Sequence, residues 1–266
     1  MTQTLTMPAQ DLNQLFDRLD NLVGQGGSLL RSRNVGEFVV DGVRYAIPRY
    51  VFSGPLAGSS PIRLGIFAGL HGDEPSGPEA FVIFLTELLR DPSRVRGYEL
   101  YIYPVTNPTG YEDGTRHNRA GKDLNREFWR NSAESEVRLL QAELISRSFQ
   151  GIISLHTDDT SDGFYGFVRG ATLTKHLIEP ALAAAEKFLP RDERPVIDGF
   201  NARNGVIRDC YDGVLSAPPK VRPRPFEIIL ETPATPPEYL KELAFVAALQ
   251  TILLEYNKFI AYAPNL

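Results

Sequence analysis

Cysteine is nearly absent from this 266-residue chain, which contains only Cys210. A single cysteine cannot form an intrachain disulfide or a cluster of thiolate metal ligands, so both are excluded. An excess of positive charge is also missing, because 28 lysines and arginines stand against 33 aspartates and glutamates, for a net charge of -5. Without a basic stripe, nucleic acid is not an expected partner.

Long hydrophobic runs are missing as well. We find no run of about 18 consecutive apolar residues, so we expect no membrane span. Residues 1–23 lack a basic segment followed by an apolar one and are better interpreted as containing an amphipathic helix, so we expect no secretory signal. The expected location is therefore cytoplasmic, and the sequence does not indicate an oligomeric state.

The apolar residues that are present fall into alternating strand and helix patterns. Residues 37–53 alternate apolar and polar side chains around an Asp-Gly pair, which is typical of a hairpin. Apolar runs predict further strands over 62–70, 98–105, 151–156 and 226–231. Helical spacing predicts helices over 11–24, 78–90, 133–148, 172–189 and 241–260.

This alternation predicts an α/β fold with a mostly parallel, mixed central sheet and helices on both faces. The composition shows no internal repeat and no linker long enough to divide the chain. We therefore expect one catalytic domain over residues 1–266, in which the helix and hairpin region 1–60 belongs to the same domain.

Ionisable residues follow two of the predicted buried strands. His71 and Glu74 come directly after the strand at 62–70, and His156 ends the strand at 151–156. If both strands lie centrally in one parallel sheet, the two imidazoles and the carboxylate converge at one edge, as the ligands of a catalytic zinc site with an open fourth position do. Alone, a His-x-x-Glu pattern is more often a turn histidine and an acid favoured by the helix dipole.

A long polar loop strengthens the catalytic interpretation. Residues 107–128, NPTGYEDGTRHNRAGKDLNREF, have few apolar anchors and follow a predicted buried strand directly. Arginine forks bind carboxylates in a bidentate way, so Asn125 and Arg126 would hold a terminal carboxylate of a substrate. Arg116 would instead face a carbonyl oxygen that becomes negative during attack. The competing interpretation is a solvated loop with scattered charges.

Together these segments resemble the zinc metallocarboxypeptidase family. In order, they read HGDE, NPTGY, GTRHN, KDLNREF, SLHTD and FEIILETP, over roughly residues 62–232. The compact spacing around KDLNR is most similar to short bacterial members that act on murein peptides. The resemblance implies a zinc carboxypeptidase-like fold, one bound zinc ion and hydrolase activity.

The resemblance also implies roles for the metal-binding residues. His71, Glu74 and His156 would bind the zinc ion. Asp123 would accept a hydrogen bond from His71, and such a partner fixes the tautomer of a ligand histidine and raises its basicity.

Further roles follow for substrate and catalysis. Asn125 and Arg126 would hold the substrate carboxylate, and Arg116 would polarise the carbonyl of the bond that is cleaved. Tyr211 lies where the family has a mobile tyrosine, some twenty residues before its catalytic glutamate, although a packed or exposed loop tyrosine is an equally good interpretation. A glutamate late in the chain, here Glu231, would be the general base.

Two glutamates compete for that last role. Glu227 and Glu231 lie on the same predicted strand and point the same way, about 13 Å apart at roughly 3.3 Å per residue. We choose Glu231 because it lies at the carboxyl end, where the site is expected. Glu227 would pair with a surface cation instead.

The expected function is zinc-dependent hydrolysis of the C-terminal amide bond of a short peptide, a murein peptide being one option. The alternative is an N-acyl amino acid deacylase of the aspartoacylase and succinylglutamate desuccinylase type. That type carries an additional β-rich domain, for which the 35 residues after Glu231 leave little space. A catalytically inactive peptide-binding module is a second alternative. The expected partner is a small peptide or acyl amino acid with a free carboxylate.

Overall fold

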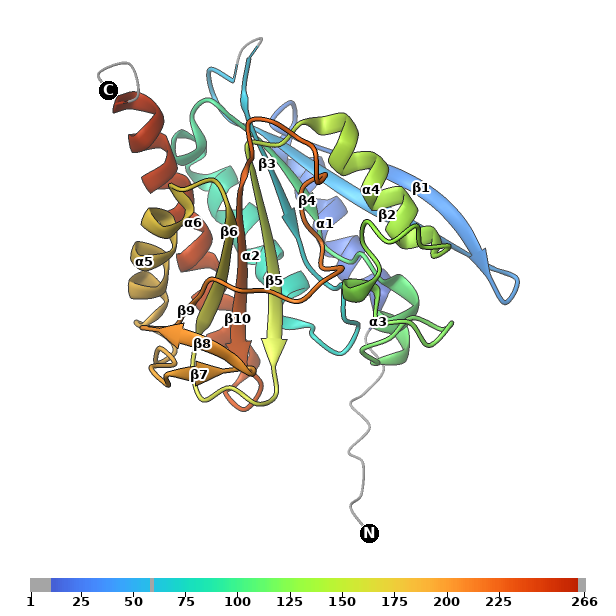
Figure 1. The fold of residues 1–266 in the computed structure, drawn as a ribbon. Helices are drawn as coiled ribbons and strands as arrows, with labels where there is room; N and C mark the ends of the chain where they lie inside the picture. Colours follow the sequence, from blue (N-terminus) through green and yellow to red (C-terminus); the bar gives the residue numbers. More distant parts are fainter. Residues whose placement is uncertain (1–10, 58–59, 263–266) are drawn as a thin grey trace.

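One mixed sheet organises the chain. The computed structural model describes residues 11–57 and 60–262, and in these residues ten strands lie in the order β1-β2-β4-β3-β5-β10-β6-β9-β8-β7 (Figure 1). The strands are β1 (Leu30–Val40), β2 (Val43–Ser53), β3 (Ile62–Phe67), β4 (Tyr98–Tyr103), β5 (Gly151–Asp158), β6 (Tyr165–Gly170), β7 (Val196–Ile197), β8 (Phe200–Arg203), β9 (Val206–Ile207) and β10 (Phe226–Pro233).

The four central strands, β4, β3, β5 and β10, are parallel. Antiparallel strands extend the sheet on both sides, with β2 and β1 beyond β4 and with β6 beyond β10. The hairpin between β1 and β2 turns at Asp41 and Gly42, which both have positive φ as a two-residue type I′ turn requires. The predicted α/β fold with a mixed central sheet is confirmed, and its parallel part is this central block.

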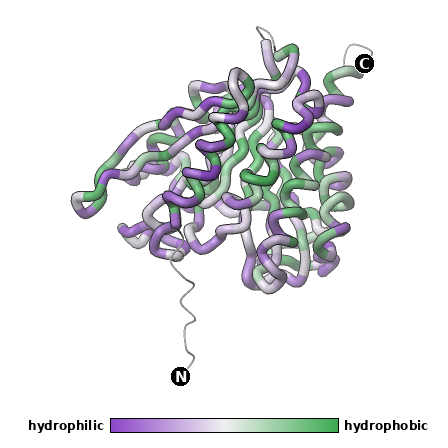
Figure 2. Tube along the Cα trace, turned by 180° about the vertical axis from the view of Figure 1, so that it is seen from behind, coloured by the Kyte–Doolittle hydropathy of each residue, from purple (hydrophilic) through white to green (hydrophobic). Residues whose placement is uncertain are grey.

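Helices cover both faces of the sheet. The helices are α1 (Leu12–Gly26), α2 (Ser76–Arg90), α3 (Pro108–Asp113), α4 (Ser135–Arg147), α5 (Thr174–Ala185) and α6 (Glu238–Tyr262), with short 3-10 turns η1 (Pro92–Val95) and η2 (Leu124–Arg126). The main core lies between the sheet and α1, α2, α5 and α6, and a second core lies under α4. Figure 2 shows apolar residues gathered along the central strands and on the helices packed against them.

The segments that follow β4 and β5 contain regular structure. The polar loop after β4 begins with α3, where Asn107 caps the helix by accepting a hydrogen bond from the Gly110 backbone and Pro108 occupies the first turn. The segment after β5 contains β6, a strand that is buried over its first four residues and pairs with β10 in antiparallel register. Strands β7, β8 and β9 are only two to four residues long, too short for a periodic signal in the sequence.

Helix α6 is long and apolar. By length and composition, Glu238–Ala261 qualifies as a candidate membrane span, although charged residues interrupt it and it contains no continuous run of 18 apolar residues. Its apolar side, including Phe245, Leu249 and Ile252, is part of the main core, and the helix contacts α2 and α5. A core helix of this kind passes the same test of length and composition.

A buried ion-pair network attaches α4 to the sheet. The Glu143 carboxylate accepts hydrogen bonds from Arg49 at 2.6 Å, from the Tyr103 hydroxyl at 2.8 Å and from Arg147 at 3.1 Å. Burial raises the pKa of Glu143, but these hydrogen bonds outweigh it and hold the pKa below its usual value. The network therefore stabilises the charged form of a carboxylate whose side chain is only 10% exposed.

Candidate metal centre and active site

The predicted metal ligands come from the carboxyl ends of two adjacent parallel strands. His71 and Glu74 lie in the loop between β3 and α2, and His156 lies in β5. Because β3 and β5 pair in parallel register, both segments reach the same edge of the sheet. Gly72 lets the loop lie directly on α3, since a β-carbon there would overlap the Gly110 carbonyl.

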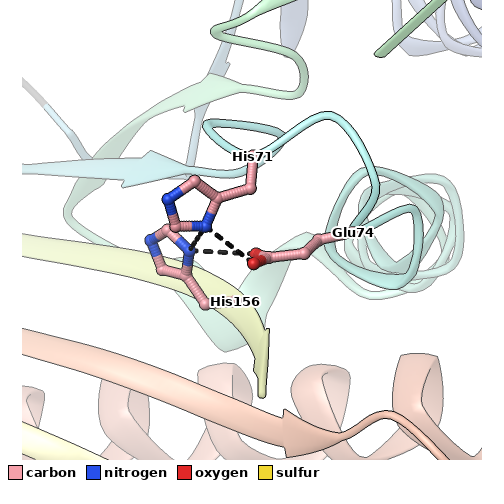
Figure 3. A group of neighbouring side chains, drawn as sticks. All are labelled: His71, Glu74 and His156. Atoms are coloured by element: carbon pink, nitrogen blue, oxygen red, sulfur yellow. Dashed lines mark hydrogen bonds and ion pairs between the residues drawn. The ribbon is translucent and has the colours of Figure 1, made fainter. Parts of the chain in front are cut away.

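The three side chains converge on one point. Nδ1 of His71 lies 2.7 Å from Glu74 Oε1, and Nδ1 of His156 lies 3.0 Å from Glu74 Oε2 (Figure 3). The two Nδ1 atoms are 3.3 Å apart, and the three ligand atoms lie within 4.8 Å of one another. All three residues are at most 5% exposed. The geometry is therefore that of a small, closed donor set.

This donor set fits a divalent cation. His71 Nε2 lies 3.1 Å from Asp123 Oδ1, and a proton on Nε2 leaves the lone pair of Nδ1 directed at His156 and Glu74. Two imidazole nitrogens at such a short distance cannot both carry a proton without repulsion, whereas both can bind one ion. Two nitrogens and one carboxylate are a common ligand set for catalytic zinc.

The electrostatics of the cluster favour positive charge at its centre. Burial opposes protonation of His71, but Glu74 and Asp123 outweigh it and raise its pKa to about 9. Burial lowers the pKa of His156. Burial alone would raise the pKa of Glu74, but the two histidines lower it far below its usual value. A buried, ionised carboxylate beside two imidazoles is what a cation site requires.

Asp123 joins the ligand cluster to Arg116. Its Oδ1 accepts from His71 and from the backbone of Asn125 at 2.9 Å, which caps η2. Its Oδ2 lies 3.2 Å from Arg116 Nε and 3.1 Å from Arg116 Nη2. Arg116 Nη1 is 3.7 Å from Glu74 Oε1, and the Arg116 side chain remains 39% exposed toward the cavity. One carboxylate thus orients both a ligand and a guanidinium.

Asn125 and Arg126 lie farther along the same wall. The side-chain oxygen Oδ1 of Asn125 accepts a hydrogen bond from the Leu215 backbone N–H at 2.9 Å, so the side-chain NH2 group of Asn125 is left for a ligand. Arg126 donates to the Asn125 backbone oxygen at 2.9 Å, and its Cζ lies 4.0 Å from the ring centroid of Tyr211. Within the part of the chain that the structure describes, Arg126 forms no ion pair with a carboxylate, in contrast to Arg116.

Glu231 lies beside His156 on the neighbouring strand. The register pairs Glu231 with His156 on one side and with Tyr165 on the other. Burial, followed by the nearby carboxylates of Glu74 and Asp158, raises the pKa of Glu231 well above its usual value. A raised pKa of this origin is typical of carboxyl groups that act in general acid–base catalysis.

Glu227 lies away from the cavity. It is 5% exposed, and Arg224 Nη2 contacts its Oε1 at 3.1 Å. The structure therefore separates the two glutamates as their positions on the strand suggested, and the partner of Glu227 is a half-buried arginine.

A single cavity of about 380 Å³ collects the predicted residues. Eight of them line it: His71, Glu74, Arg116, Asn125, Arg126, His156, Tyr211 and Glu231. Asp123 does not line the cavity and contacts the ligand cluster through its hydrogen bond with His71. Sequence reasoning had no specific place for two further lining residues, Tyr165 and Asp198. The Asp-Gly pair at 198–199 was the available signal, and it indicates the turn that carries Asp198.

Comparisons with known proteins identify a related catalytic domain and related structures. A family model described as the succinylglutamate desuccinylase/aspartoacylase catalytic domain matches residues 61–191. No curated protein matches. A Shewanella denitrificans protein assigned as a metallopeptidase shares 26% identity over 92% of this chain and 90% of its own, with a TM-score of 0.77.

Two more distant structures share the fold. A metallo-carboxypeptidase from Burkholderia cenocepacia is 18% identical over 91% of this chain and 69% of its own, with a TM-score of 0.67. A metallo-carboxypeptidase from Pseudomonas aeruginosa, in complex with (2-guanidinoethylmercapto)succinic acid, is 16% identical over 94% of this chain and 70% of its own, with a TM-score of 0.66.

Proposed function

We propose, from the premise that the chain is a zinc carboxypeptidase-like hydrolase, that it cleaves an amide bond next to a free carboxylate in a short peptide. One observation carries the proposal. The donor set of His71, Glu74 and His156 shares one cavity with Glu231 and with Arg126, for which the described residues provide no carboxylate partner. A metal site, an anion site and a proton acceptor are thus within reach of one small substrate.

His71 Nδ1, His156 Nδ1 and one Glu74 oxygen would hold the ion, and zinc is the ion that suits these donors best. Bound there, it would supply a Lewis acid that polarises a carbonyl and lowers the pKa of water. Arg116 faces the same point and would stabilise negative charge that develops on the carbonyl oxygen. Its contact with Asp123 keeps the guanidinium in place before substrate arrives.

Glu231 would move the proton. Its raised pKa reflects burial and neighbouring carboxylates, so it can take a proton from the attacking water and release it to the leaving amine nitrogen. Arg126 and the amide NH2 of Asn125 would bind the terminal carboxylate and fix the scissile bond relative to the donor set.

The charges of the cavity favour a substrate with one carboxylate. Arg116 is already paired with Asp123, so Arg126 is the cation available to a substrate anion. A second anionic group would meet Asp158 and Asp198, which also line the cavity. This balance supports a peptide more than a succinyl or aspartyl substrate, which carries additional carboxylates.

An N-acyl amino acid deacylase is the second candidate, and the family model over residues 61–191 favours it. Both candidates use the same donor set, arginines and glutamate, so only the acyl group distinguishes them. We further propose that residues 1–266 act as one catalytic domain in the cytoplasm, where trimming of short peptides is the role that fits the site. Murein peptides carry additional carboxylates and are therefore less favoured by the cavity charges than peptides with a single carboxylate.

The test combines metal analysis with a substrate panel. The zinc content of the purified protein is measured for the wild type, His71→Ala and the control His176→Ala, whose exposed histidine lies on α5. We expect about one zinc per chain in the wild type and the control, and loss of zinc from His71→Ala. A dipeptide, its C-terminal amide, a murein tripeptide, an N-acetyl amino acid and an N-succinyl amino acid are then compared.

Faster turnover of the free-acid peptides than of the amide and both acyl amino acids supports the proposal. Faster turnover of an acyl amino acid would favour the deacylase. Peptide release that is equal in the wild type and in zinc-free His71→Ala would refute metal-dependent hydrolysis at this site.

A further inference from the structure

The guanidinium of Arg126 lies over the ring of Tyr211, with 4.0 Å between Cζ and the ring centroid. The aromatic face carries partial negative charge, so it attracts a cation placed above it. The contact occupies one face of the guanidinium, and Nη1 donates to the Asn125 backbone oxygen at 2.9 Å; among the described residues no hydrogen bond occupies the Nε and Nη2 side. Carboxylates bind that side through two parallel hydrogen bonds.

Tyr211 is itself held in place on two sides. Its hydroxyl donates to Asp198 Oδ1 at 2.9 Å, and its ring packs edge-on against Phe200 with centroids 4.8 Å apart. Asp198 belongs to the tight turn between β7 and β8, where Asp198 and Gly199 both have positive φ. The ring position is therefore fixed by a rigid two-residue hairpin turn.

Backbone contacts hold the loop that carries Tyr211 against the loop that carries Arg126. The Phe128 backbone donates to the Gly213 carbonyl at 2.9 Å. Gly213 has a φ of 77°, and a β-carbon there would overlap the Arg126 backbone. The Trp129 indole also donates to the Ser216 carbonyl at 3.1 Å. These contacts hold the loop that carries Tyr211 and the loop that carries Arg126 in a fixed position relative to each other.

We propose that Tyr211 is a positioning residue, which holds the Arg126 guanidinium with its edge toward the substrate carboxylate, while Asp198 holds Tyr211. The kinetic part of this inference rests on the function proposed above. A flexible arginine loses side-chain freedom when it binds a carboxylate, and a stack formed in advance removes part of that cost. Tyr211 then contributes to affinity for the carboxylate without entering the chemical step.

The kinetic test uses Tyr211→Leu, which removes the ring, and Tyr211→Phe, which keeps it. Tyr239→Leu is the control, because Tyr239 is 59% exposed on α6. The zinc-loaded variants are assayed on a dipeptide and on its C-terminal amide. We expect Tyr211→Leu to raise KM for the free acid by roughly two- to thirtyfold, the range that a cation–π contact supports, with kcat nearly unchanged.

The amide should respond little to either variant, because it lacks the carboxylate. Tyr211→Phe keeps the ring and loses only the hydrogen bond to Asp198, so it should raise KM for the free acid by less than Tyr211→Leu does. Equal losses on the acid and the amide would overturn the inference. So would a kcat defect in Tyr211→Phe as large as that in Tyr211→Leu, which would show that the hydroxyl acts in the chemical step.

Crystal structures of the two variants decide the inference even if no peptide is hydrolysed. We expect the Arg126 guanidinium to leave its position in Tyr211→Leu and to keep it in Tyr211→Phe. A guanidinium that stays in place in Tyr211→Leu refutes the positioning role. A lack of wild-type turnover would count against the proposed function alone.

Discussion

Asp123 offers the sharpest test of how the site is built, because its two oxygens serve different partners. Oδ1 accepts from His71 Nε2 at 3.1 Å, and Oδ2 pairs with Arg116 at 3.1 Å. Removing the carboxylate in Asp123→Ala leaves a ligand imidazole without the acceptor that fixes its tautomer. Loss of such a partner lowers metal affinity by about 10- to 100-fold, which is about 1.4–2.7 kcal/mol.

Asp123→Asn separates the two effects. The amide oxygen can still accept from His71, so we expect zinc affinity to fall by less than in Asp123→Ala. The lost negative charge releases Arg116, so kcat should fall in both variants. Zinc dissociation constants from competition with a fluorescent chelator measure the first effect, and steady-state kinetics at saturating zinc measure the second.

Asp113→Ala is the matched control. Asp113 pairs with Arg119 at 2.8 Å in the same polar loop, but neither residue lines the cavity. We expect its zinc affinity and kcat to match those of the wild type. If folded Asp123→Ala binds zinc within about twofold of the wild type, the contact between Asp123 and His71 has no role in metal binding, and the reasoning is refuted.

Three further predictions concern the strand, the core and the ligand loop. Glu231→Gln should lower kcat by about 100- to 10,000-fold with zinc content unchanged. The control Glu227→Gln, on the same face of the strand, should remain active. Equal activity of the two variants would exclude Glu231 as the proton acceptor. Glu143→Gln should cost about 3–5 kcal/mol of unfolding free energy in urea titrations at pH 7, because it breaks a buried ion-pair network. Because the folded-state pKa of Glu143 is depressed, its contribution to the free energy of unfolding is complete above the unfolded pKa of about 4.3 and is lost as the pH falls through the folded-state pKa. A Glu143→Gln variant that loses stability in parallel with the wild type over this acid range would contradict the assignment. Gly72→Ala should reduce both stability and zinc content, because the added methyl group overlaps the Gly110 carbonyl, and a melting temperature equal to that of the wild type would show that the loop can shift.

Strong local signals made most of the fold predictable. The Asp-Gly pair and the alternation of 37–53 match the β1–β2 hairpin, and the buried runs match β3, β5 and β10. Strands β7, β8 and β9 were not predicted, because strands of only two to four residues are too short to show an alternating hydrophobic pattern and form only through pairing with their neighbours. The sequence also cannot specify which strand pairs with β10 on the side away from β5, and that pairing with β6 places Tyr165 beside Glu231.

The metal centre was predictable for a topological reason. Once β3 and β5 are taken as parallel neighbours, the residues after their carboxyl ends must meet, and His71 and His156 do. The partners of Tyr211 were not predictable in this way. Its contacts with Arg126 and Asp198 join three loops, whose relative positions depend on tertiary packing and not on any repeating pattern.

The pairing of His156 with Glu231 in the register of β5 and β10 has a consequence for heat inactivation. A ladder of main-chain hydrogen bonds sets their separation, so these two groups should part only when the central sheet itself melts. The Arg126–Tyr211 contact depends on loops and should open at lower temperature. On warming, the contact between Arg126 and Tyr211 should therefore be lost before the pairing of His156 with Glu231.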